Sequence, residues 1–461
     1  MTQLEATKIN ELKDSLRGEI LLPGNGAYES ARKIWNAMID KRPALIARCA
    51  NTSDVVQAVD FARDNGLLLA VRGGGHNIAG NAMCDDGIVI DLSQMKAASV
   101  DADRRRVTIE GGATLADLDA ATQAHGLATP VGINSTTGVA GLTLGGGFGW
   151  LSRKYGMTID NLESAEVVTA AGEVVRASFD EHPDLFWALR GGGGNFGVVT
   201  RFEFRLHPVG PNVLSGLIVY PLSEAKSVLQ RYRDFAAKAP NDLSVWTLLR
   251  QAPPLPFLPK EAHGKGIVAL ALLYAGNPKQ GEPLIEPLRK FGTPVGEHVG
   301  VQPYTAWQQT FDPLLTAGAR NYWKSNNFST LDNGLFDVVI EHVGRFPSPQ
   351  CEIFFGALGG ATARPAPDSA AYPHRDAHFV MNFHGRWENP ADDARCIGWA
   401  RDFFNASAPF ASGGVYVNFL TADEDDRVRA AYGSNYDRLA QVKRKYDPKN
   451  LFRMNQNIKP T

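Results

Sequence analysis

Three glycine clusters hold the residues of this sequence whose types and spacing could do chemistry. The first, Arg72-Gly73-Gly74-Gly75-His76-Asn77, follows an apolar stretch. Glycines placed after a strand let backbone N–H groups turn toward a bound anion, and a diphosphate is the ligand that we expect there. The second cluster spans residues 138–149 and the third spans residues 191–197. Such a high density of glycine indicates a site where a flat or highly charged group approaches the main chain. The alternative interpretation is that these glycines allow loops to pack tightly.

The third cluster contains a literal G-x-G-x-x-G, from Gly192 to Gly197. In a dinucleotide-binding fold this pattern follows a strand and opens a helix. Here a predicted helix, PDLFWALR at 183–190, precedes the glycines, and a predicted strand at 198–206 follows them. Because the order is reversed, we predict no NAD site at this motif.

Composition indicates an ordinary globular protein of two or three domains. The chain has 461 residues, 44% of them hydrophobic and 21% charged, and a formal net charge of -2. This balance gives no bulk attraction to nucleic acid or to an anionic membrane. We expect no membrane span, since no apolar run reaches about 18 residues. The N-terminal residues do not form a secretory signal, so we expect a cytoplasmic protein.

Four scattered cysteines, Cys49, Cys84, Cys351 and Cys396, form no C-x-x-C pair. We therefore predict reduced, mostly buried thiols, with neither a metal site nor a disulfide framework. The sequence does not indicate an oligomeric state.

Alternating strands and helices are predicted from Pro43 to Pro208. Ser53 is expected to cap a helix that Gly66 ends, and Thr114 with Asp117 forms a capping box for a helix reaching His125. The other elements predicted in this region are strands at 67–72, 87–93 and 198–206 and a hairpin at 166–178 that turns at Ala171-Gly172.

The region from about Pro211 to Pro409 has a different character. Amphipathic helices such as 223–239 alternate with strands such as 266–276 and 379–387, which predicts an α+β domain with helices against one sheet face. Residues 413–460 are predicted to hold a strand, a charged helix from about 425 to 446, and a coiled tail.

Several motifs occur in an order that resembles a known family. RGGGHN, GVAGLTLGGGFGWLSRKYG, PDLFWALRGGGGNFGVVT and YDPKNLFRMNQNI are similar to motifs of the FAD-linked oxidases of the p-cresol methylhydroxylase and vanillyl-alcohol oxidase superfamily. The closer likeness is to the berberine-bridge-enzyme-like branch, and within it to bacterial members of the 6-hydroxy-D-nicotine-oxidase type. The likeness covers about residues 39–209 and 411–461.

The resemblance implies an α+β fold in two domains. Residues 1–209, with a core at about 39–209, would form a two-part FAD-binding domain that residues 411–461 complete. Residues 210–410 would form a substrate domain with an antiparallel sheet flanked by helices.

The resemblance also implies a covalent cofactor. His76 stands where the family's histidine is bonded to the flavin 8α-methyl carbon. Bicovalent relatives have a cysteine where this chain has Asn134, so we expect FAD on a single bond to His76 and no cysteinyl bond. The matching motif positions imply further contacts with FAD or its surroundings from Arg72, Gly73, Gly74, Gly75, Asn77, Gly80, Asn134, Ser135, Thr137, Gly138, Val139, Gly141, Leu142, Gly145, Gly149, Asp160, Asn161, Gly193, Gly194, Asn195, Gly197, Val199, Tyr416, Asn418, Asn455 and Asn457.

The implied reaction is hydride transfer from a small alcohol or amine to FAD, with dioxygen reoxidising the flavin and yielding hydrogen peroxide. Thr137 stands where the family controls oxygen access, and its intermediate size favours an oxidase. A dehydrogenase with another electron acceptor, a carbohydrate oxidase and a flavin-holding binding protein remain alternatives. Several aromatic residues predict either an apolar substrate pocket or core packing: Tyr304, Trp307, Phe311, Tyr322, Trp323, Phe383 and Trp387.

Three residues are candidates for substrate chemistry. Asn382 and His384 alternate to the same side of the predicted strand 379–387, and Tyr416 is expected to open a strand that carries Asn418. Berberine-type relatives place a catalytic glutamate near strand 379–387. No carboxylate occupies that strand here, so His384 and Tyr416 become the candidate general bases, and a structural role is the alternative for each.

Overall fold

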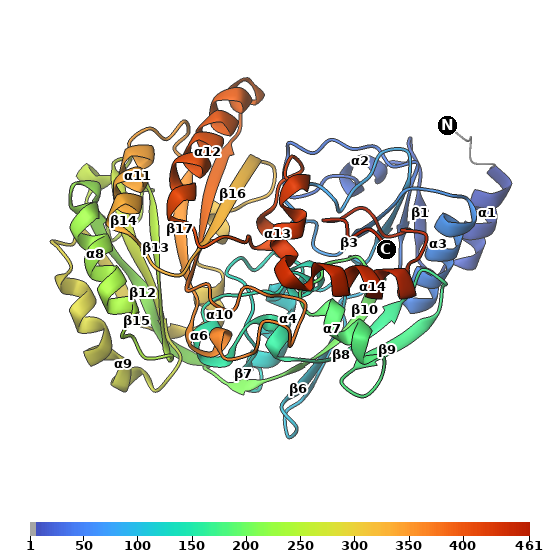
Figure 1. The fold of residues 1–461 in the computed structure, drawn as a ribbon, viewed down its shortest axis with the longest axis horizontal. Coiled ribbons are helices and arrows are strands. Elements are labelled where there is room, and N and C mark those ends of the chain that lie inside the picture. Colours follow the sequence, from blue (N-terminus) through green and yellow to red (C-terminus); the bar gives the residue numbers. More distant parts are fainter. Residues whose placement is uncertain (1–5) are drawn as a thin grey trace.

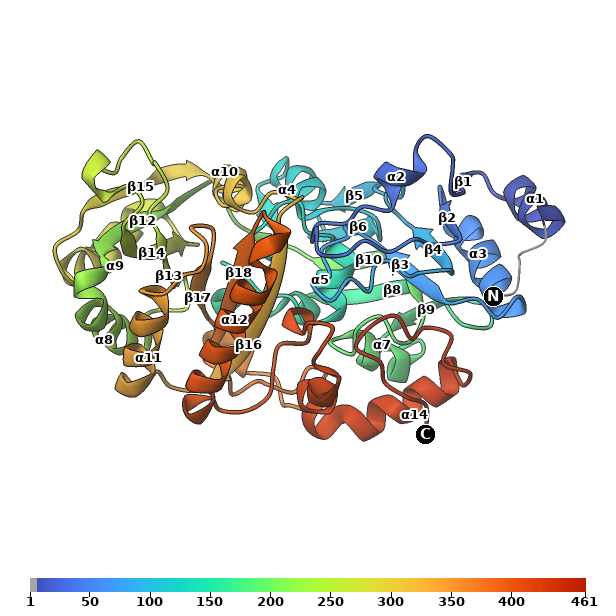
Figure 2. The same cartoon turned by 90° about the horizontal axis from the view of Figure 1, so that it is seen from above.

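The structure is a computed structural model that describes residues 6–461. The first five residues lie outside the described residues. One end of the molecule is a large sheet backed by helices, and the other holds smaller sheets (Figures 1 and 2). The C-terminal segment, red in both views, runs from the large sheet to the second end, where its last helix lies beside residues 183–189 (Figures 1 and 2).

A four-stranded sheet of order β1-β2-β4-β3 leads into the first glycine cluster. Strands β2, β4 and β3 are parallel, and β1 is antiparallel to β2. Most residues of β2, β3 and β4 are buried and apolar, as expected for a parallel sheet covered on both faces. The elements of this part are α1 (Ala6–Ser15), β1 (Glu19–Leu21), α2 (Tyr28–Ala31), β2 (Leu45–Arg48), α3 (Thr52–Asp64), β3 (Leu69–Arg72) and β4 (Ile88–Asp91).

The cap predicted for α3 is wrong by two residues. The Oδ1 atom of Asn51, not Ser53, accepts a hydrogen bond from the backbone N–H of Asp54 at 3.1 Å. The run Asn-Thr-Ser-Asp offers several side chains able to cap a helix, so the pattern alone could not choose among them. Gly66, at a φ of +63°, follows the end of the helix as predicted.

A five-stranded antiparallel sheet of order β5-β6-β10-β8-β9 follows. The hairpin between β8 and β9 is confirmed, and Gly172 turns it at a φ of +81°. The capping box of Thr114 and Asp117 is confirmed too. The elements are β5 (Ala98–Asp101), β6 (Arg106–Glu110), α4 (Leu115–Gln123), β7 (Leu127–Ala128), α5 (Val139–Leu144), α6 (Ser152–Tyr155), β8 (Leu162–Val168), β9 (Val174–Ser178), α7 (Pro183–Leu189), β10 (Val198–Arg205) and β11 (His207–Pro208).

A seven-stranded antiparallel sheet of order β15-β12-β14-β13-β17-β18-β16 forms the other half. Helices α8, α9, α11 and α12 cover its outer face (Figure 2), so its other face is turned toward the glycine clusters. The elements are β12 (Asn212–Pro221), α8 (Ala225–Ala236), β13 (Leu243–Gln251), β14 (Gly266–Tyr274), α9 (Pro278–Ile285), β15 (Gly296–Pro303), α10 (Tyr304–Gln308), β16 (Arg320–Phe328), α11 (Asn333–Val343), β17 (Glu352–Ala357), β18 (Phe379–Trp387) and α12 (Asp393–Ser407).

The C-terminal segment differs from its prediction in two ways. Among the described residues after 413 there is no strand: Tyr416 precedes a short 3₁₀ turn, Val417–Phe419. The predicted long helix is divided into α13 (Val428–Tyr432) and α14 (Tyr436–Tyr446), because Gly433 at a φ of +49° interrupts it. The domain boundaries near 209 and 410 stay a prediction.

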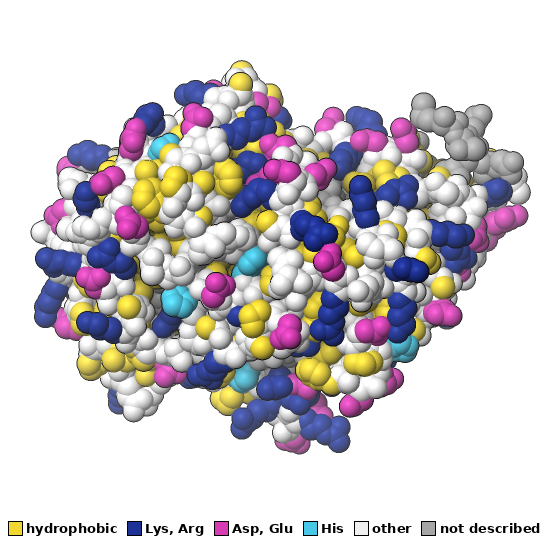
Figure 3. All heavy atoms as spheres, in the orientation of Figure 1, with side chains coloured by type: hydrophobic (Ala, Val, Ile, Leu, Met, Phe, Trp, Pro, Cys, Tyr) yellow, Lys and Arg dark blue, Asp and Glu magenta, His cyan; other side chains and the backbone are white. Residues whose placement is uncertain are grey.

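Charges of both signs are interspersed on the face of the molecule shown in Figure 3. Within residues 6–461, no helix is both long and apolar enough to cross a membrane. In the same part of the chain, no cluster of His, Cys, Asp and Glu side chains is arranged to hold a metal ion.

A buried carboxyl joins the two halves where α4 meets α10. Gln308 of α10 donates through Nε2 to Asp119 Oδ2 at 3.0 Å and to the carbonyl oxygen of Gly132 at 3.2 Å. Burial raises the pKa of Asp119 to about 7, although the hydrogen bond from Gln308 opposes this shift. The unfolded chain, with an ordinary carboxyl pKa of about 4, ionises at a lower pH.

Ionisation of Asp119 therefore favours the unfolded state, and its destabilising effect grows from about pH 4 and is complete above about pH 7. We expect Asp119→Asn to raise the unfolding free energy at pH 8 by on the order of 2–4 kcal/mol. Thermal unfolding measured from pH 4 to pH 8 checks this: the gain over the wild type should shrink as pH falls. An equal gain at both ends of the range would contradict the assignment.

Candidate active site

A cleft lies between the glycine clusters and the inner face of the seven-stranded sheet. All three clusters contribute main chain to its wall, and the C-terminal segment contributes side chains. The sequence-predicted residues that line the cleft are Gly73, Gly74, Gly75, His76, Asn77, Asn134, Thr137, Gly138, Gly141, Leu142, Gly193, Gly194, Gly197, Val199, His384, Tyr416, Asn418 and Asn455.

Other predicted site residues lie behind this wall and support it. Asp160 forms an ion pair with Arg375, with two N–O distances of 2.8 Å. Asn195 Oδ1 accepts from the backbone N–H of Ile458 at 2.9 Å, which fixes the tail. The predicted residues outside the cleft lining are Arg72, Gly80, Ser135, Val139, Gly145, Gly149, Asp160, Asn161, Asn195, Asn382 and Asn457.

The first two glycine clusters touch through their backbones. A Cβ atom placed on Gly74 would lie 2.3 Å from the nitrogen of Gly138, and one on Gly138 would lie 2.3 Å from the nitrogen of Gly74. No side chain fits between them. By contrast, a Cβ on Gly141 or Gly194 would meet nothing within 4 Å, because the main chain there faces the open cleft.

His76 stands at the edge of the cleft in a defined position. The indole of Trp35 stacks on its ring with centroids 5.1 Å apart, and Thr136 Oγ1 lies 2.9 Å from Nε2. Burial lowers the pKa of His76 to about 4, so the imidazole is neutral near pH 7. Trp35 was missed by the sequence reasoning, since a lone tryptophan upstream of the motifs carries no signal.

Aromatic side chains form the opposite wall. Phe419, from the C-terminal segment, has its ring centroid 5.4 Å from Trp323 of β16 and 6.0 Å from Phe354 of β17. Tyr322 points to the other face of β16 and donates to Asp423, so only Trp323 of this predicted pair reaches the cleft. The other aromatic residues of the lining are Trp35, Phe148, Trp150, Trp246, Phe311, Tyr416 and Phe452.

A buried carboxylate, which the sequence reasoning missed, faces the cleft beside His384. Glu352 of β17 lies opposite His384 of β18 in the strand register, and Oε1 of Glu352 is 3.2 Å from Nδ1 of His384. Arg250 donates to the other oxygen at 2.7 Å. Strand 379–387 has no carboxylate, as the sequence shows, but the neighbouring strand β17 supplies one that the sequence interpretation did not consider. The alternation of residues 352–357, which turns Glu352 and Phe354 to one face, was the available signal.

The two groups of this pair influence each other's ionisation. Burial opposes the charge on Glu352, but the hydrogen bond with His384 and the charge of Arg250 outweigh it and lower its pKa to about 2. Burial lowers the pKa of His384, and Glu352 opposes that shift. His384 Nε2 also lies 2.9 Å from Oδ1 of Asn321. If His384 is protonated, both of its ring N–H groups can donate a hydrogen bond, one to Glu352 and the other to Asn321 Oδ1.

Tyr416 lines the cleft, whereas Asn382 does not. The hydroxyl of Tyr416 accepts hydrogen bonds from the N–H of Gly147 at 3.0 Å and from Asn418 Nδ2 at 3.1 Å. Burial raises the pKa of Tyr416 to about 12, so it is neutral near pH 7. Asn382 is fully buried on the same sheet face as His384, with neither amide atom hydrogen-bonded.

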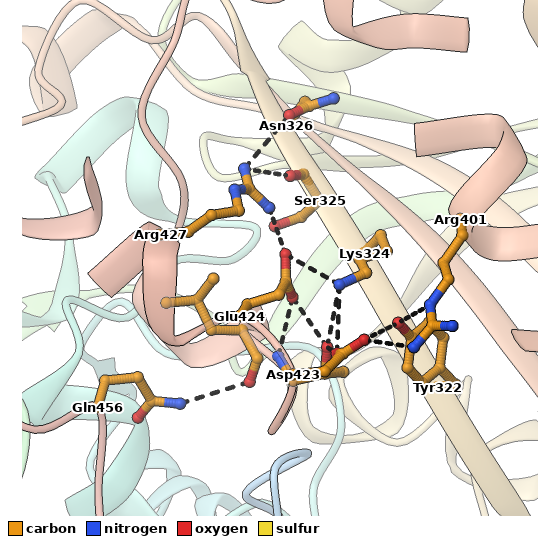
Figure 4. Close-up of polar contacts among 11 residues, drawn as sticks. Tyr322, Lys324, Ser325, Asn326, Arg401, Asp423, Glu424, Arg427 and Gln456 are labelled. Atoms are coloured by element: carbon orange, nitrogen blue, oxygen red, sulfur yellow. Dashed lines mark hydrogen bonds and ion pairs between the residues drawn. The ribbon is translucent and has the colours of Figure 1, made fainter. Parts of the chain in front are cut away.

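A charged network ties the C-terminal segment to β16 (Figure 4). Lys324 Nζ lies 3.3 Å from both Asp423 and Glu424, and Tyr322 donates to Asp423 at 2.7 Å. Further along the segment, Gln456 lines the cleft and donates to the carbonyl of Leu420 at 3.4 Å. This network holds Tyr416, Asn418 and Phe419 against the inner face of the sheet.

Comparison with known proteins fits this geometry. A family model described as an FAD binding domain matches residues 43–178, and one described as berberine and berberine like matches residues 415–459. An FAD-linked oxidoreductase of Dictyostelium discoideum is 34% identical over 457 residues, 98% of this chain and 97% of its own. (R)-6-hydroxynicotine oxidase of Paenarthrobacter nicotinovorans is 32% identical over 466 residues, which cover 97% of each chain.

The crystal structure of 6-hydroxy-D-nicotine oxidase from Arthrobacter nicotinovorans has the same fold, with a TM-score of 0.87 at 30% identity over 97% of this chain and 99% of that one. Fold and cleft together define an enzyme, an FAD-dependent oxidoreductase. The chain belongs to the berberine-bridge-enzyme-like FAD-linked oxidoreductases of the p-cresol methylhydroxylase and vanillyl-alcohol oxidase superfamily. The predicted α+β fold is confirmed.

The residues of the cleft fit FAD. The main chain at Gly141 and Gly194 has open space beside it, since a Cβ there would meet nothing within 4 Å, and a diphosphate can approach such a main chain closely. The Oδ1 atoms of Asn455 and Asn457 are buried without a hydrogen-bond partner. Gly73 to Asn77, Gly138 to Leu142 and Asn418 would therefore surround the cofactor.

Two helical glycines provide a matched test of this fit. Gly141 of α5 and Gly398 of α12 both have room for a methyl group, but only Gly141 faces the cleft. We expect Gly141→Ala to lower the flavin content of the purified protein, measured as the ratio of visible to ultraviolet absorbance. Gly398→Ala should retain full flavin content. Both apoproteins should be at least as stable as the wild type, since alanine favours a helix over glycine by about 1 kcal/mol.

Proposed function

We propose that this protein is an oxidase that carries FAD on a single covalent bond to His76 and oxidises a small alcohol or amine. The observation that carries the proposal is the neutral imidazole of His76, held by Trp35 and Thr136 at the edge of a cleft of exposed main-chain amides. A neutral ring nitrogen can act as a nucleophile toward an electrophilic methyl carbon. Asn134, which also lines the cleft, has no thiol that could make a second bond.

When bound, FAD supplies the hydride acceptor and passes its electrons on to dioxygen. The chain's own residues bind and orient the substrate. The wall of Trp246, Trp323, Phe354 and Phe419 favours an apolar, aromatic substrate, and the named activity of the relative from Paenarthrobacter nicotinovorans agrees with this preference. The Glu352–His384 pair supplies the polar group that this wall otherwise lacks.

The same pair is the proposed proton acceptor. Glu352 stays ionised, and neutral His384 takes the proton that leaves the substrate OH or NH as hydride is lost. This step requires His384 Nε2 to exchange its contact with Asn321 Oδ1 for one with the substrate. The added charge would be balanced by Glu352, which has a hydrogen bond to the ring. Tyr416, with its raised pKa, acts in this proposal as a hydrogen-bonding residue that orients Asn418.

The covalent bond is tested with the denatured protein. We expect yellow flavin to stay with the acid-precipitated wild-type chain, and proteolysis should recover it on the peptide that contains His76. His76→Ala should release all flavin into the supernatant, because the nucleophile is gone. His125→Ala, a change at an exposed histidine outside the cleft, should retain it. Flavin that is freely released from the wild type would overturn the covalent part of the proposal.

The catalytic pair is tested by rate and by pH dependence. Glu352→Gln should slow substrate-dependent flavin reduction by about 10²–10³-fold, with the exposed Glu173→Gln as control. Since His384 must be deprotonated to accept a proton, kcat/KM should fall as pH drops through its pKa, which lies below the usual 6.5. In Glu352→Gln the pKa loses the raising influence of the carboxylate, so this limb should move to lower pH. An unchanged limb would exclude the pair as the base.

The reaction itself is tested with a panel of aromatic alcohols and amines and of sugars. Anaerobic bleaching of the visible flavin band identifies the substrate class, and peroxide formed in air separates an oxidase from a dehydrogenase. Bleaching without rapid reoxidation would mean a dehydrogenase, and bleaching by sugars alone a carbohydrate oxidase. No bleaching by any compound would favour a flavin-holding protein without turnover.

A further inference from the structure

Two residues of the loop between β7 and α5 determine which ring nitrogen of His76 carries a proton. Thr136 Oγ1 lies 2.9 Å from His76 Nε2, and the same hydroxyl donates to Asn134 Oδ1 at 2.7 Å. The backbone N–H of Thr136 also donates to Asn134 Oδ1, at 3.1 Å. The hydroxyl of Thr136 therefore lies between the amide of Asn134 and the imidazole.

The backbone fixes the orientation of the Asn134 amide. A backbone N–H can only donate, so the Asn134 atom that it contacts must be the oxygen and not the NH2 group. That oxygen can only accept, and the hydroxyl of Thr136 has a single proton to donate to it. The hydroxyl therefore presents a lone pair to His76.

This lone pair requires an N–H group on His76 Nε2. Burial lowers the pKa of His76, against the effect of the Thr136 main chain, so the ring is neutral near pH 7 and has one N–H group. With that proton on Nε2, the free lone pair of the ring is on Nδ1. The indole of Trp35, stacked on the ring at an angle of 21°, hinders the half-turn that would exchange the two nitrogens.

We propose that Asn134 and Thr136 are positioning residues for the attachment of FAD: they hold the proton of His76 on Nε2 and so present Nδ1 as the nucleophile. Their role in attachment rests on the proposed function, whereas the tautomer of His76 does not. As the bond forms between Nδ1 and the 8α carbon, the methyl group loses one proton and Nε2 releases another. The electron pair passes through FAD to dioxygen, which takes up both protons and leaves as hydrogen peroxide.

The same contacts suit the ring after the bond has formed. Nε2 then has a lone pair, and the hydroxyl of Thr136 can turn its proton from Asn134 to Nε2. Asn134 Oδ1 keeps the backbone N–H of Thr136 as its donor. Because a hydroxyl both accepts and donates, Thr136 can bond to the ring before and after attachment.

The tautomer is tested by NMR on the full-length protein, made in riboflavin-starved cells with isotope-labelled histidine. Correlations between ring protons and ring nitrogens distinguish an N–H at Nε2 from one at Nδ1, and the signals absent from His76→Ala belong to His76. We expect the proton on Nε2 near pH 7. A proton on Nδ1 would overturn the proposal.

The bonded nitrogen is tested on the holoenzyme. After proteolysis, NMR of the flavin peptide that contains His76 should show the flavin on Nδ1, and a flavin on Nε2 would contradict the proposal. Freely released flavin together with a proton on Nε2 would remove the covalent bond of the proposed function and leave the assigned tautomer. A covalent bond together with a proton on Nδ1 would keep the proposed function and remove the role of Asn134 and Thr136.

The hydroxyl is tested by the rate at which added FAD becomes resistant to acid precipitation of the apoprotein. Thr136→Val keeps the shape of the side chain, and attachment should be about tenfold slower, the effect of one lost hydrogen bond. Thr136→Ser should restore the rate, and Thr330→Val, at an exposed threonine outside the cleft, should leave it unchanged. Equal rates in Thr136→Val and the wild type would exclude the hydroxyl from this role.

The contribution of Asn134 is tested with Thr136 intact. In Asn134→Ala the hydroxyl is free to donate to Nε2, so more of His76 should carry its proton on Nδ1 and attachment should slow. The double variant should be no slower than Thr136→Val alone, because both changes act through one hydrogen bond. Effects that multiply would separate Asn134 from Thr136 and overturn the proposed chain. If a variant fails to fold, the two NMR measurements on the wild type decide.

Discussion

The close approach of two backbones, at Gly74 and Gly138, is the constraint on which the site depends. A Cβ atom on either glycine would lie 2.3 Å from the nitrogen of the other, so neither position tolerates a side chain. This contact brings the loop after β3, which carries His76, against the start of α5, which carries Gly141. Two segments over sixty residues apart in sequence thereby present their amides to one cleft. Glycines lose more conformational entropy on folding than other residues do. They occur in spite of this where a ligand must contact the main chain directly.

Strand β16 contributes to both the cleft and the charged network, because its two faces contact different parts of the molecule. Trp323 faces the cleft, while Tyr322 and Lys324 face the charged network that holds Asp423 and Glu424. Hydrogen bonds from Tyr322 and Arg401, against the effect of burial, lower the pKa of Asp423, so the network stays charged at neutral pH. The aromatic wall and the segment that covers it are thus positioned by one strand.

Much of this could be predicted from sequence, and the failures have physical causes. Glycine clusters, a capping box and a hairpin turn are local signals, and the structure has them where the sequence places them. Glu352 was missed because its role depends on pairing with His384, a contact between strands that are over thirty residues apart. The strand expected at Tyr416 is a 3₁₀ turn because Phe419 packs on Trp323 and Phe354 of the sheet, and this tertiary contact overrides a local apolar pattern.

The buried Lys443 has a consequence for how the third glycine cluster depends on the C-terminal segment. From α14, its ammonium group donates to Asp447 and to the carbonyl oxygens of Asn195 and Phe452, each within 2.8 Å. One buried side chain thereby joins the glycine cluster, the helix and the stretch that leads to Asn455. Loss of this ammonium group would leave three buried oxygen atoms without this donor, so a change remote from the substrate would loosen one wall of the cleft.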